Sequence, residues 1–168
     1  FGRTGDWSGA RHWNVKPDMM TCAKAITSAY YPFGATMIGE KVTDVFESDE
    51  TGAASIGHGY TYSAHPVGAA AAVACLKETK RLKVNENAKI RGTQIFDAVV
   101  KLKEKYDIIG DVRGGHGLMT ALEFVSDKAS KTPLDNDSMA KIQKTAYEHG
   151  AFVRVGGHNI MMSPPLIV

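Results

Sequence analysis

The feature that most constrains the fold is a change of pattern at Pro66. Before it, the apolar runs 19–25 and 34–38 are short and bounded by turn-forming residues, which predicts strands joined by loops. After it, residues 67–82 are rich in alanine and follow a proline at a plausible first helical position. The pattern therefore predicts strands and loops that lead into one long helix.

The rest of the chain alternates between helical and strand patterns. Asn85 is placed to cap a second helix that ends near Tyr106. Its expected apolar face is Ala88, Ile90, Ile95, Val99 and Leu102. Strands are expected at 108–112, 118–125, 152–155 and 160–162, with a helix at 136–149 between the middle two. The order predicts an α/β part, residues 1–75, followed by a smaller α+β part, residues 76–168.

Composition limits the class of protein. With 168 residues, 43% hydrophobic and 23% charged, the chain is expected to fold around a core. A net charge of +2 with both signs scattered does not favour a nucleic-acid partner. Because no apolar run approaches the roughly 20 residues that cross a bilayer, a soluble, cytoplasmic protein is expected. The start on Phe1 and the apolar end at 163–168 indicate a part of a longer protein.

Lys24 is the first candidate functional residue. It lies among small and apolar residues in the segment 21–27, directly after a predicted strand. Desolvation there would lower the pKa of the amine and make it nucleophilic toward an aldehyde. The alternative is an ordinary solvated surface lysine.

Two further signals are a loop and an arginine. The segment 57–66 combines glycines and hydroxyls and runs into a helix start, so its hydroxyls and N–H groups could bind phosphate, or it is an ordinary capped loop. Arg154, between Val153 and Val155 and before a Gly-Gly turn, suits a carboxylate clamp or a structural salt bridge.

Other chemistries are disfavoured. The six histidines are scattered and no CxxC occurs, so no metal is expected. Cys22 and Cys75 lie far apart in apolar settings and are expected to be buried thiols. The glycine-rich segment 114–117 precedes a strand rather than a helix, which disfavours a nucleotide loop, and Ser63 lacks the GxSxG frame of serine hydrolases.

Taken in order, five segments closely resemble class III aminotransferases of the ω-amino acid or amine:pyruvate type. They are FGRTG (1–5), PDMMTCAKAITSAYYPFGA (17–35), GHGYTYSAHPVGAAAA (57–72), DVRGGHGLMTALEFV (111–125) and GAFVRVGGHNIMMSPPL (150–166). The resemblance implies a fold type I transferase dependent on pyridoxal 5'-phosphate (PLP). The chain would then hold the end of the large, mostly parallel-sheet domain and the small C-terminal domain.

The resemblance also implies roles for individual residues. Lys24 falls on the lysine that holds the cofactor as a Schiff base. Thr61 falls on the hydroxyl that reaches the cofactor phosphate of the partner subunit in a homodimer, and Tyr60 contributes backbone and pocket wall beside it. Arg154 falls on the arginine that grips a substrate carboxylate or swings away for an uncharged amine. Ala64 departs from the family, because a glycine is common at that place.

The expected activity is ping-pong transamination, in which an amine or ω-amino acid donates its amino group to a keto acid such as pyruvate. Dimers could pair further into tetramers. The alternatives are a PLP-dependent aminomutase or racemase of the same fold, a lysine Schiff-base aldolase, and a non-catalytic interaction domain.

Overall fold

The computed structural model describes all residues from Phe1 to Val168 and divides them into two compact units. The first unit holds Phe1 and residues 9–82, and the second holds residues 2–8 and 83–168. Whether the units correspond to the domains 1–75 and 76–168 stays a prediction.

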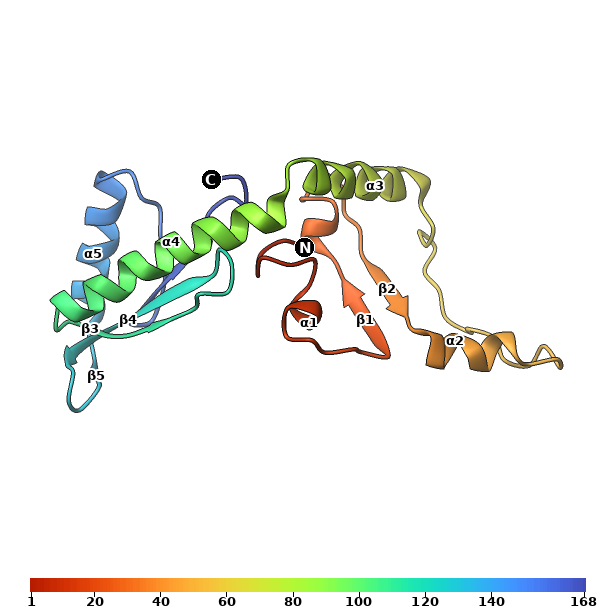
Figure 1. The fold of residues 1–168 in the computed structure, drawn as a ribbon, viewed down its shortest axis with the longest axis horizontal. Coiled ribbons are helices and arrows are strands. Elements are labelled where there is room, and N and C mark those ends of the chain that lie inside the picture. Colours follow the sequence, from red (N-terminus) through yellow and green to blue (C-terminus); the bar gives the residue numbers. More distant parts are fainter. The chain divides into compact units, whose positions relative to one another are not determined.

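The first unit contains a two-stranded antiparallel sheet. Its strands are β1 (Met19–Cys22) and β2 (Ala35–Ile38), which confirms the two strands expected there (Figure 1). A short 3-10 helix, η1 (Lys24–Ile26), follows β1 almost at once. The unit also holds the one-turn helix α1 (Gly9–His12) and the helix α2 (Glu40–Glu47), and the sequence pattern predicted neither.

Helix α3 (Pro66–Arg81) is the alanine-rich helix that the sequence predicts, with the proline in its first turn. It buries Ala72 and contacts η1. A hydrogen bond from the Cys75 thiol to the Ala25 carbonyl, with Sγ and oxygen 3.6 Å apart, joins the same two elements. Helix α3 therefore supports the turn that carries Lys24.

The second unit is built on a five-stranded sheet in the order β3-β4-β7-β6, with β5 paired to β4. Every pairing in it is antiparallel. The strands are β3 (Ile109–Arg113), β4 (Thr120–Asp127), β5 (Thr132–Pro133), β6 (Arg154–Gly156) and β7 (Asn159–Met162). Four were expected within a few residues of these bounds, whereas the two-residue β5 was not.

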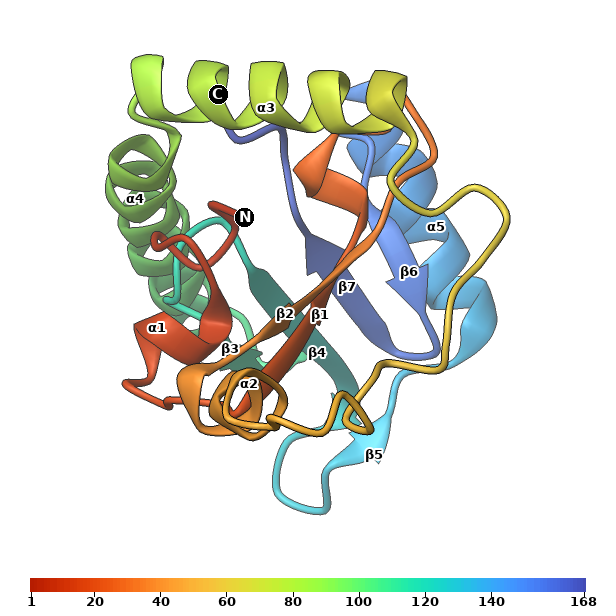
Figure 2. The same cartoon turned by 90° about the vertical axis from the view of Figure 1, so that its right-hand side faces the viewer.

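Helices α4 (Val84–Lys105) and α5 (Asn136–Glu148) cover one face of this sheet (Figure 2). Val99 of α4 and Met139 of α5 share one buried cluster with side chains of β3, β4 and β7. Helix α5 begins at the N-cap Asp135, which accepts a hydrogen bond of 2.9 Å from the Ser138 amide. Both helices were expected from their periodicity.

The expected cap of α4 is wrong. The helix begins at Val84, and its N-cap is Lys83, which has a left-handed φ of 50° and makes no side-chain cap. Asn85 lies inside the first turn, where its Oδ1 is buried without a hydrogen-bond partner. The helix starts before Asn85 because the left-handed backbone of Lys83 sets its first turn at Val84, and no capping side chain takes part.

The expected apolar face of α4 is also partly wrong, because Ile90 and Leu102 are 58% and 41% exposed. The helix instead buries Val84, Ala88, Gly92 and Val99. A Cβ at Gly92 would collide with the backbone of Gly117, so the glycine allows the loop before β4 to touch the helix. None of the helices combines the length and the apolar character that crossing a bilayer requires.

Candidate functional site

Lys24 lies at the junction between strand β1 and the 3-10 helix η1. Ala23 is extended, and Lys24 then takes a left-handed φ of 55°. This conformation is uncommon for a residue with a side chain, and such residues concentrate at functional sites. The expected placement of Lys24 directly after a strand is confirmed. The backbone conformation at Lys24, which carries some strain, sets the direction of its side chain.

Buried residues fix the base of this turn. Ile26 and Thr27 are 6% and 2% exposed. The Thr27 hydroxyl donates a hydrogen bond of 2.6 Å to the Tyr31 carbonyl, which holds the following loop. Lys24 thus projects from an anchored segment, and no hydrogen bond or ion pair engages its amine within the chain.

The residues next to Lys24 in the sequence do not bury its side chain, although such desolvation was expected. The side chain is exposed, although its sequence neighbours are small and apolar. The neighbours Ala23 and Ala25 are too small to cover a lysine side chain, and Ile26 turns inward. The first unit by itself therefore leaves the Lys24 side chain open to solvent.

Thr61 lies in a tight turn between Tyr60 and Ser63. The Ser63 amide donates to the Tyr60 carbonyl at 2.9 Å, and the Tyr60 amide donates to the Ser63 hydroxyl at 3.0 Å. The turn uses both flanking residues and leaves the exposed Thr61 hydroxyl without a partner in the chain. Tyr60 is itself 75% exposed. A hydroxyl so placed is free to bind an anion from solvent or from another subunit.

Ala64 connects this turn to helix α3 with a left-handed φ of 58°. Glycine adopts that conformation at lower cost than alanine. A glycine would therefore fit this position with less strain. Ala64 adopts the same left-handed conformation despite its side chain. After Ala64, His65 is the N-cap residue, and its ring lies 3.3 Å from the Tyr31 hydroxyl.

Two open pockets of about 780 and 600 Å³ lie beside the same loop. Tyr60 and Ser63 line both of them, whereas Lys24 and Thr61 line neither. No group of three or more metal-binding side chains gathers anywhere in residues 1–168. Cys22 and Cys75 are free thiols, and both are only partly buried rather than fully buried as expected.

Arg154 begins strand β6, at the edge of the sheet in the second unit. Its neighbours Val153 and Val155 pack against the buried cluster, so Arg154 between them faces the other side of the sheet. The arginine is exposed and has no ion-pair or hydrogen-bond partner in the chain. The structural salt bridge considered as the alternative is therefore absent from these residues.

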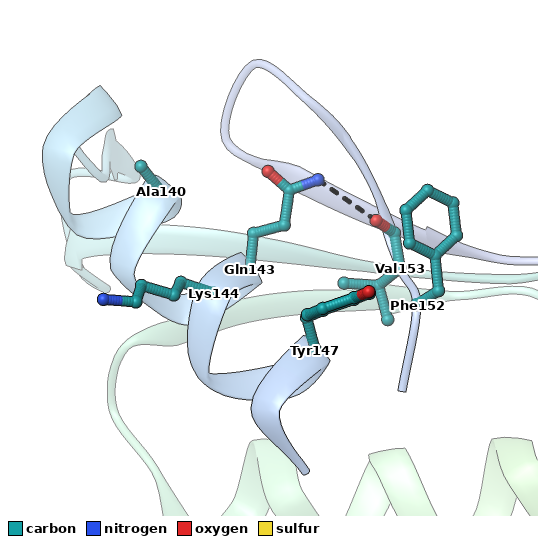
Figure 3. Close-up of a pocket in the computed structure, with 6 residues that line it drawn as sticks. All are labelled: Ala140, Gln143, Lys144, Tyr147, Phe152 and Val153. Carbon is teal, nitrogen blue, oxygen red and sulfur yellow. Dashed lines mark hydrogen bonds between the residues drawn. The ribbon is translucent and has the colours of Figure 1, made fainter. Parts of the chain in front are cut away.

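Helix α5 supports the backbone next to Arg154. Gln143 donates a hydrogen bond of 3.2 Å from its side-chain amide to the Val153 carbonyl (Figure 3). Both residues line a pocket of about 260 Å³ that also contains Tyr147 and Phe152, whose rings meet edge to face. Sequence reasoning missed Gln143, and its position on the α5 face toward β6 was the available signal.

Lys24 and Thr61 belong to the first unit and Arg154 to the second. Each unit by itself presents unpaired polar groups: an amine and a hydroxyl in one, a guanidinium in the other. The amine can react with a carbonyl, and the hydroxyl can donate a hydrogen bond to a phosphate. The guanidinium can pair with a carboxylate.

A family model described as Aminotransferase class-III matches residues 1–168. The chain is 41% identical over 174 residues to an uncharacterized aminotransferase of Sinorhizobium fredii, covering 99% of this chain and 36% of that protein. It is 38% identical over 170 residues to gamma-aminobutyrate transaminase 1, mitochondrial, of Oryza sativa subsp. indica, covering 100% of this chain and 33% of that protein. The chain therefore spans about a third of the length of these curated relatives.

Solved structures match over nearly the same range. An amine transaminase from an uncultivated Pseudomonas species, in a PLP-bound form, has a TM-score of 0.88 and 40% identity, covering 99% of this chain and 38% of that chain. An (S)-enantioselective omega-transaminase from Thermomicrobium roseum has a TM-score of 0.86 and 35% identity, covering 100% of this chain and 37% of that one. Both likenesses extend through the two units.

Proposed function

Because the chain belongs to the aminotransferase class-III family, we propose that the protein is a PLP-dependent transaminase. It moves an amino group from an amine or ω-amino acid to a keto acid, with pyruvate as the acceptor, in a ping-pong cycle. The observation that carries the proposal is the exposed, unpaired Lys24 amine at the end of β1, held in a left-handed turn. The expected α/β fold of this class is confirmed by the likeness to solved transaminases.

The donor set fits PLP. A primary amine suits its aldehyde, a hydroxyl in a turn before a helix N-terminus suits its phosphate, and a guanidinium suits a substrate carboxylate. When bound, the cofactor supplies an electron sink for the negative charge that develops at the substrate carbon. Residues 1–75 would form the end of the large cofactor-binding domain and residues 76–168 the small domain.

The chain's own residues have three tasks. Lys24 would hold the cofactor through its Nζ, and the same amine would take and return the proton at the substrate carbon. Thr61 donates a hydrogen bond to the phosphate of the cofactor held by the second subunit of a homodimer, with Tyr60 beside it. Arg154 binds the carboxylate of the keto acid or amino acid and so orients the reacting carbon.

The proposed compartment is the cytoplasm. Two relatives carry mitochondrial and chloroplastic names, so the full-length protein's location has to be measured directly. A fusion to a fluorescent protein, imaged against organelle markers, gives that answer.

The test of function uses the full-length protein incubated with an amine donor and pyruvate. L-Alanine should form at the expense of the donor. Borohydride reduction of the loaded protein followed by peptide mapping should then place the cofactor on Lys24. Lys24→Ala should abolish both alanine formation and labelling, whereas Lys77→Ala on α3 should leave both unchanged.

Labelling of another lysine would overturn the role of Lys24. A protein that epimerises or isomerises amino acids without using a keto acid would instead be a racemase or an aminomutase. A protein that takes up no PLP would be a non-catalytic member of the family.

A further inference from the structure

The face of the second unit's sheet that carries Arg154 lies opposite helices α4 and α5. Side chains alternate along a strand, and Ile160 and Met162 pack against the helical side, as do Val153 and Val155. Arg154 and Met161 therefore share the other face, which we call the open face. Its members are Asp111, Arg113, Ala121, Glu123, Arg154, Gly156, Asn159 and Met161.

Strand register places four of these residues in one row across the sheet. Arg154 pairs with Met161, Met161 with Ala121, and Ala121 with Arg113. Directly opposed residues of an antiparallel pair hold their Cβ atoms about 4.5–5.5 Å apart. Met161 is thus the immediate cross-strand neighbour of Arg154, while Arg113 lies at the far end of the row.

The two arginines of this row differ in their partners. Arg113 donates to Glu123 and, at 3.3 Å, to Asp111, and its other nitrogen donates to Asn159 at 2.7 Å. Two carboxylates thus balance the charge of Arg113 and three acceptors engage its guanidinium. Arg154 has no such partner. Arg154 is therefore the cation of this row that remains available to a ligand.

The surface beside Arg154 is apolar and open. A Cβ at Gly156 would lie 2.9 Å from the Met161 terminal methyl, so the Met161 side chain extends over Gly156 on the open face. Met161 is only partly buried, and its thioether is flexible. The free guanidinium thus has a methionine surface on one side and no second unpaired cation along its row.

We propose that Met161 is a specificity-determining residue that acts beside Arg154. The carboxylate of an ω-amino acid binds Arg154, and the methylene chain attached to it lies along the Met161 side chain. Arg113 is already paired with Glu123 and Asp111, so Arg154 is the cation of this row left for the carboxylate of a linear ω-amino acid. This inference rests on the proposed transaminase function and on the carboxylate-binding role of Arg154.

The test compares linear ω-amino acids of increasing chain length as donors to the full-length enzyme, each measured by kcat/KM. In the unaltered enzyme, each methylene that packs on Met161 should raise kcat/KM by up to about fourfold, the gain for one buried CH₂. Met161→Ala should flatten this dependence, and Met161→Leu, which keeps an apolar surface of similar volume, should retain it. The reaction of a carboxylate-free amine should be unchanged in both variants.

The outcomes separate the two proposals. Suppose that Arg154→Ala loses activity with ω-amino acids, but kcat/KM of Met161→Ala still depends on chain length as in the unaltered enzyme. That result overturns the role of Met161 alone. An equal loss for the carboxylate-free amine also overturns it, because it marks a structural role. Absence of transamination in the unaltered enzyme overturns the proposed function itself.

Discussion

Gln143 of α5 donates a hydrogen bond of 3.2 Å to the backbone carbonyl of Val153, the residue that precedes Arg154. The bond ties a helix to the start of an edge strand that has a neighbour on one side only. Since Val153 also packs against the core, the backbone at Arg154 is held by a polar and an apolar contact. The position of the proposed carboxylate-binding group is thus set by a side chain of α5 and by the buried cluster.

Gln143→Ala should loosen the strand start and raise the KM for keto acids two- to tenfold. A net hydrogen bond contributes about 0.5–1.5 kcal/mol, which corresponds to that range. Steady-state kinetics of the full-length enzyme measure the effect. Lys144→Ala, an exposed neighbour on the same helix, is the matched control and should leave the KM unchanged.

Arg154→Ala should lower kcat/KM for keto acids by roughly 2–3 kcal/mol of transition-state stabilisation, the scale of a lost charged hydrogen-bond pair. Single-turnover reaction with a carboxylate-free amine should be little affected, because that substrate offers the guanidinium no partner. Arg91→Ala, at an exposed position on α4, serves as the control for loss of positive charge. Equal losses for amine and keto acid would make Arg154 a structural residue.

Thr61→Ala should weaken cofactor retention by about 1–3 kcal/mol, because the phosphate would lose one hydrogen bond. Equilibrium dialysis of PLP against the full-length protein measures the change. Thr61→Ser keeps the hydroxyl and should restore retention. The turn itself should survive both changes, since its two hydrogen bonds come from Tyr60 and Ser63. Retention unaltered in the alanine variant would contradict the phosphate role.

Ala64→Gly should stabilise the protein by roughly 0.5–1 kcal/mol, because it relieves the left-handed conformation at φ 58° and loses part of that gain to backbone entropy. The thermal unfolding midpoint reports the change. Ala69→Gly, in the helical part of α3, is the opposite control and should destabilise by about 1 kcal/mol. A lower midpoint for Ala64→Gly would show that the alanine methyl makes contacts worth more than the strain.

Asp111 should contribute stability that depends on pH. The hydrogen bond from Lys103, at 2.8 Å, holds the pKa of this carboxyl below its usual value. A carboxyl whose pKa is depressed by folding stabilises the protein above its unfolded pKa of about 3.9, and this stability is lost as the pH falls through the folded pKa. Asp111→Asn should therefore lower the unfolding midpoint at neutral pH, and the difference from the unaltered protein should shrink as the pH falls from the unfolded pKa through the folded pKa.

The control for this pH dependence is Asp107→Asn. Asp107 is fully exposed, and its carboxylate forms only a weak ion pair with Lys128, at 4.0 Å. Its replacement should therefore change the unfolding midpoint little at neutral or acid pH. The difference in unfolding midpoint between Asp111→Asn and the unaltered protein should depend on pH. If it stayed constant with pH, the charge of Asp111 would not be the cause of the difference.

The sequence by itself determined the elements whose patterns are long and regular, together with the residues that carry the family resemblance. Helices α3, α4 and α5 and most strands follow from periodicity, and Lys24, Thr61 and Arg154 are identified by the motifs in which they lie. Local pattern suffices there because propensity and amphipathic spacing act within one element. The eight-residue α2 and the two-residue β5 were missed because so few residues carry too weak a pattern.

Only the tertiary structure decided what surrounds each residue. Small neighbours in sequence predicted a desolvated Lys24, yet the chain folds Ile26 inward and leaves the lysine exposed. Asn85 has a side chain that could cap a helix, yet the left-handed Lys83 is the N-cap of α4 and the Asn85 Oδ1 stays buried without a hydrogen-bond partner. The pairing of Arg154 with Met161 and the hydrogen bond from Arg113 to Asn159 depend on strand register. Contacts between residues far apart in sequence fix that register, and local pattern does not contain it.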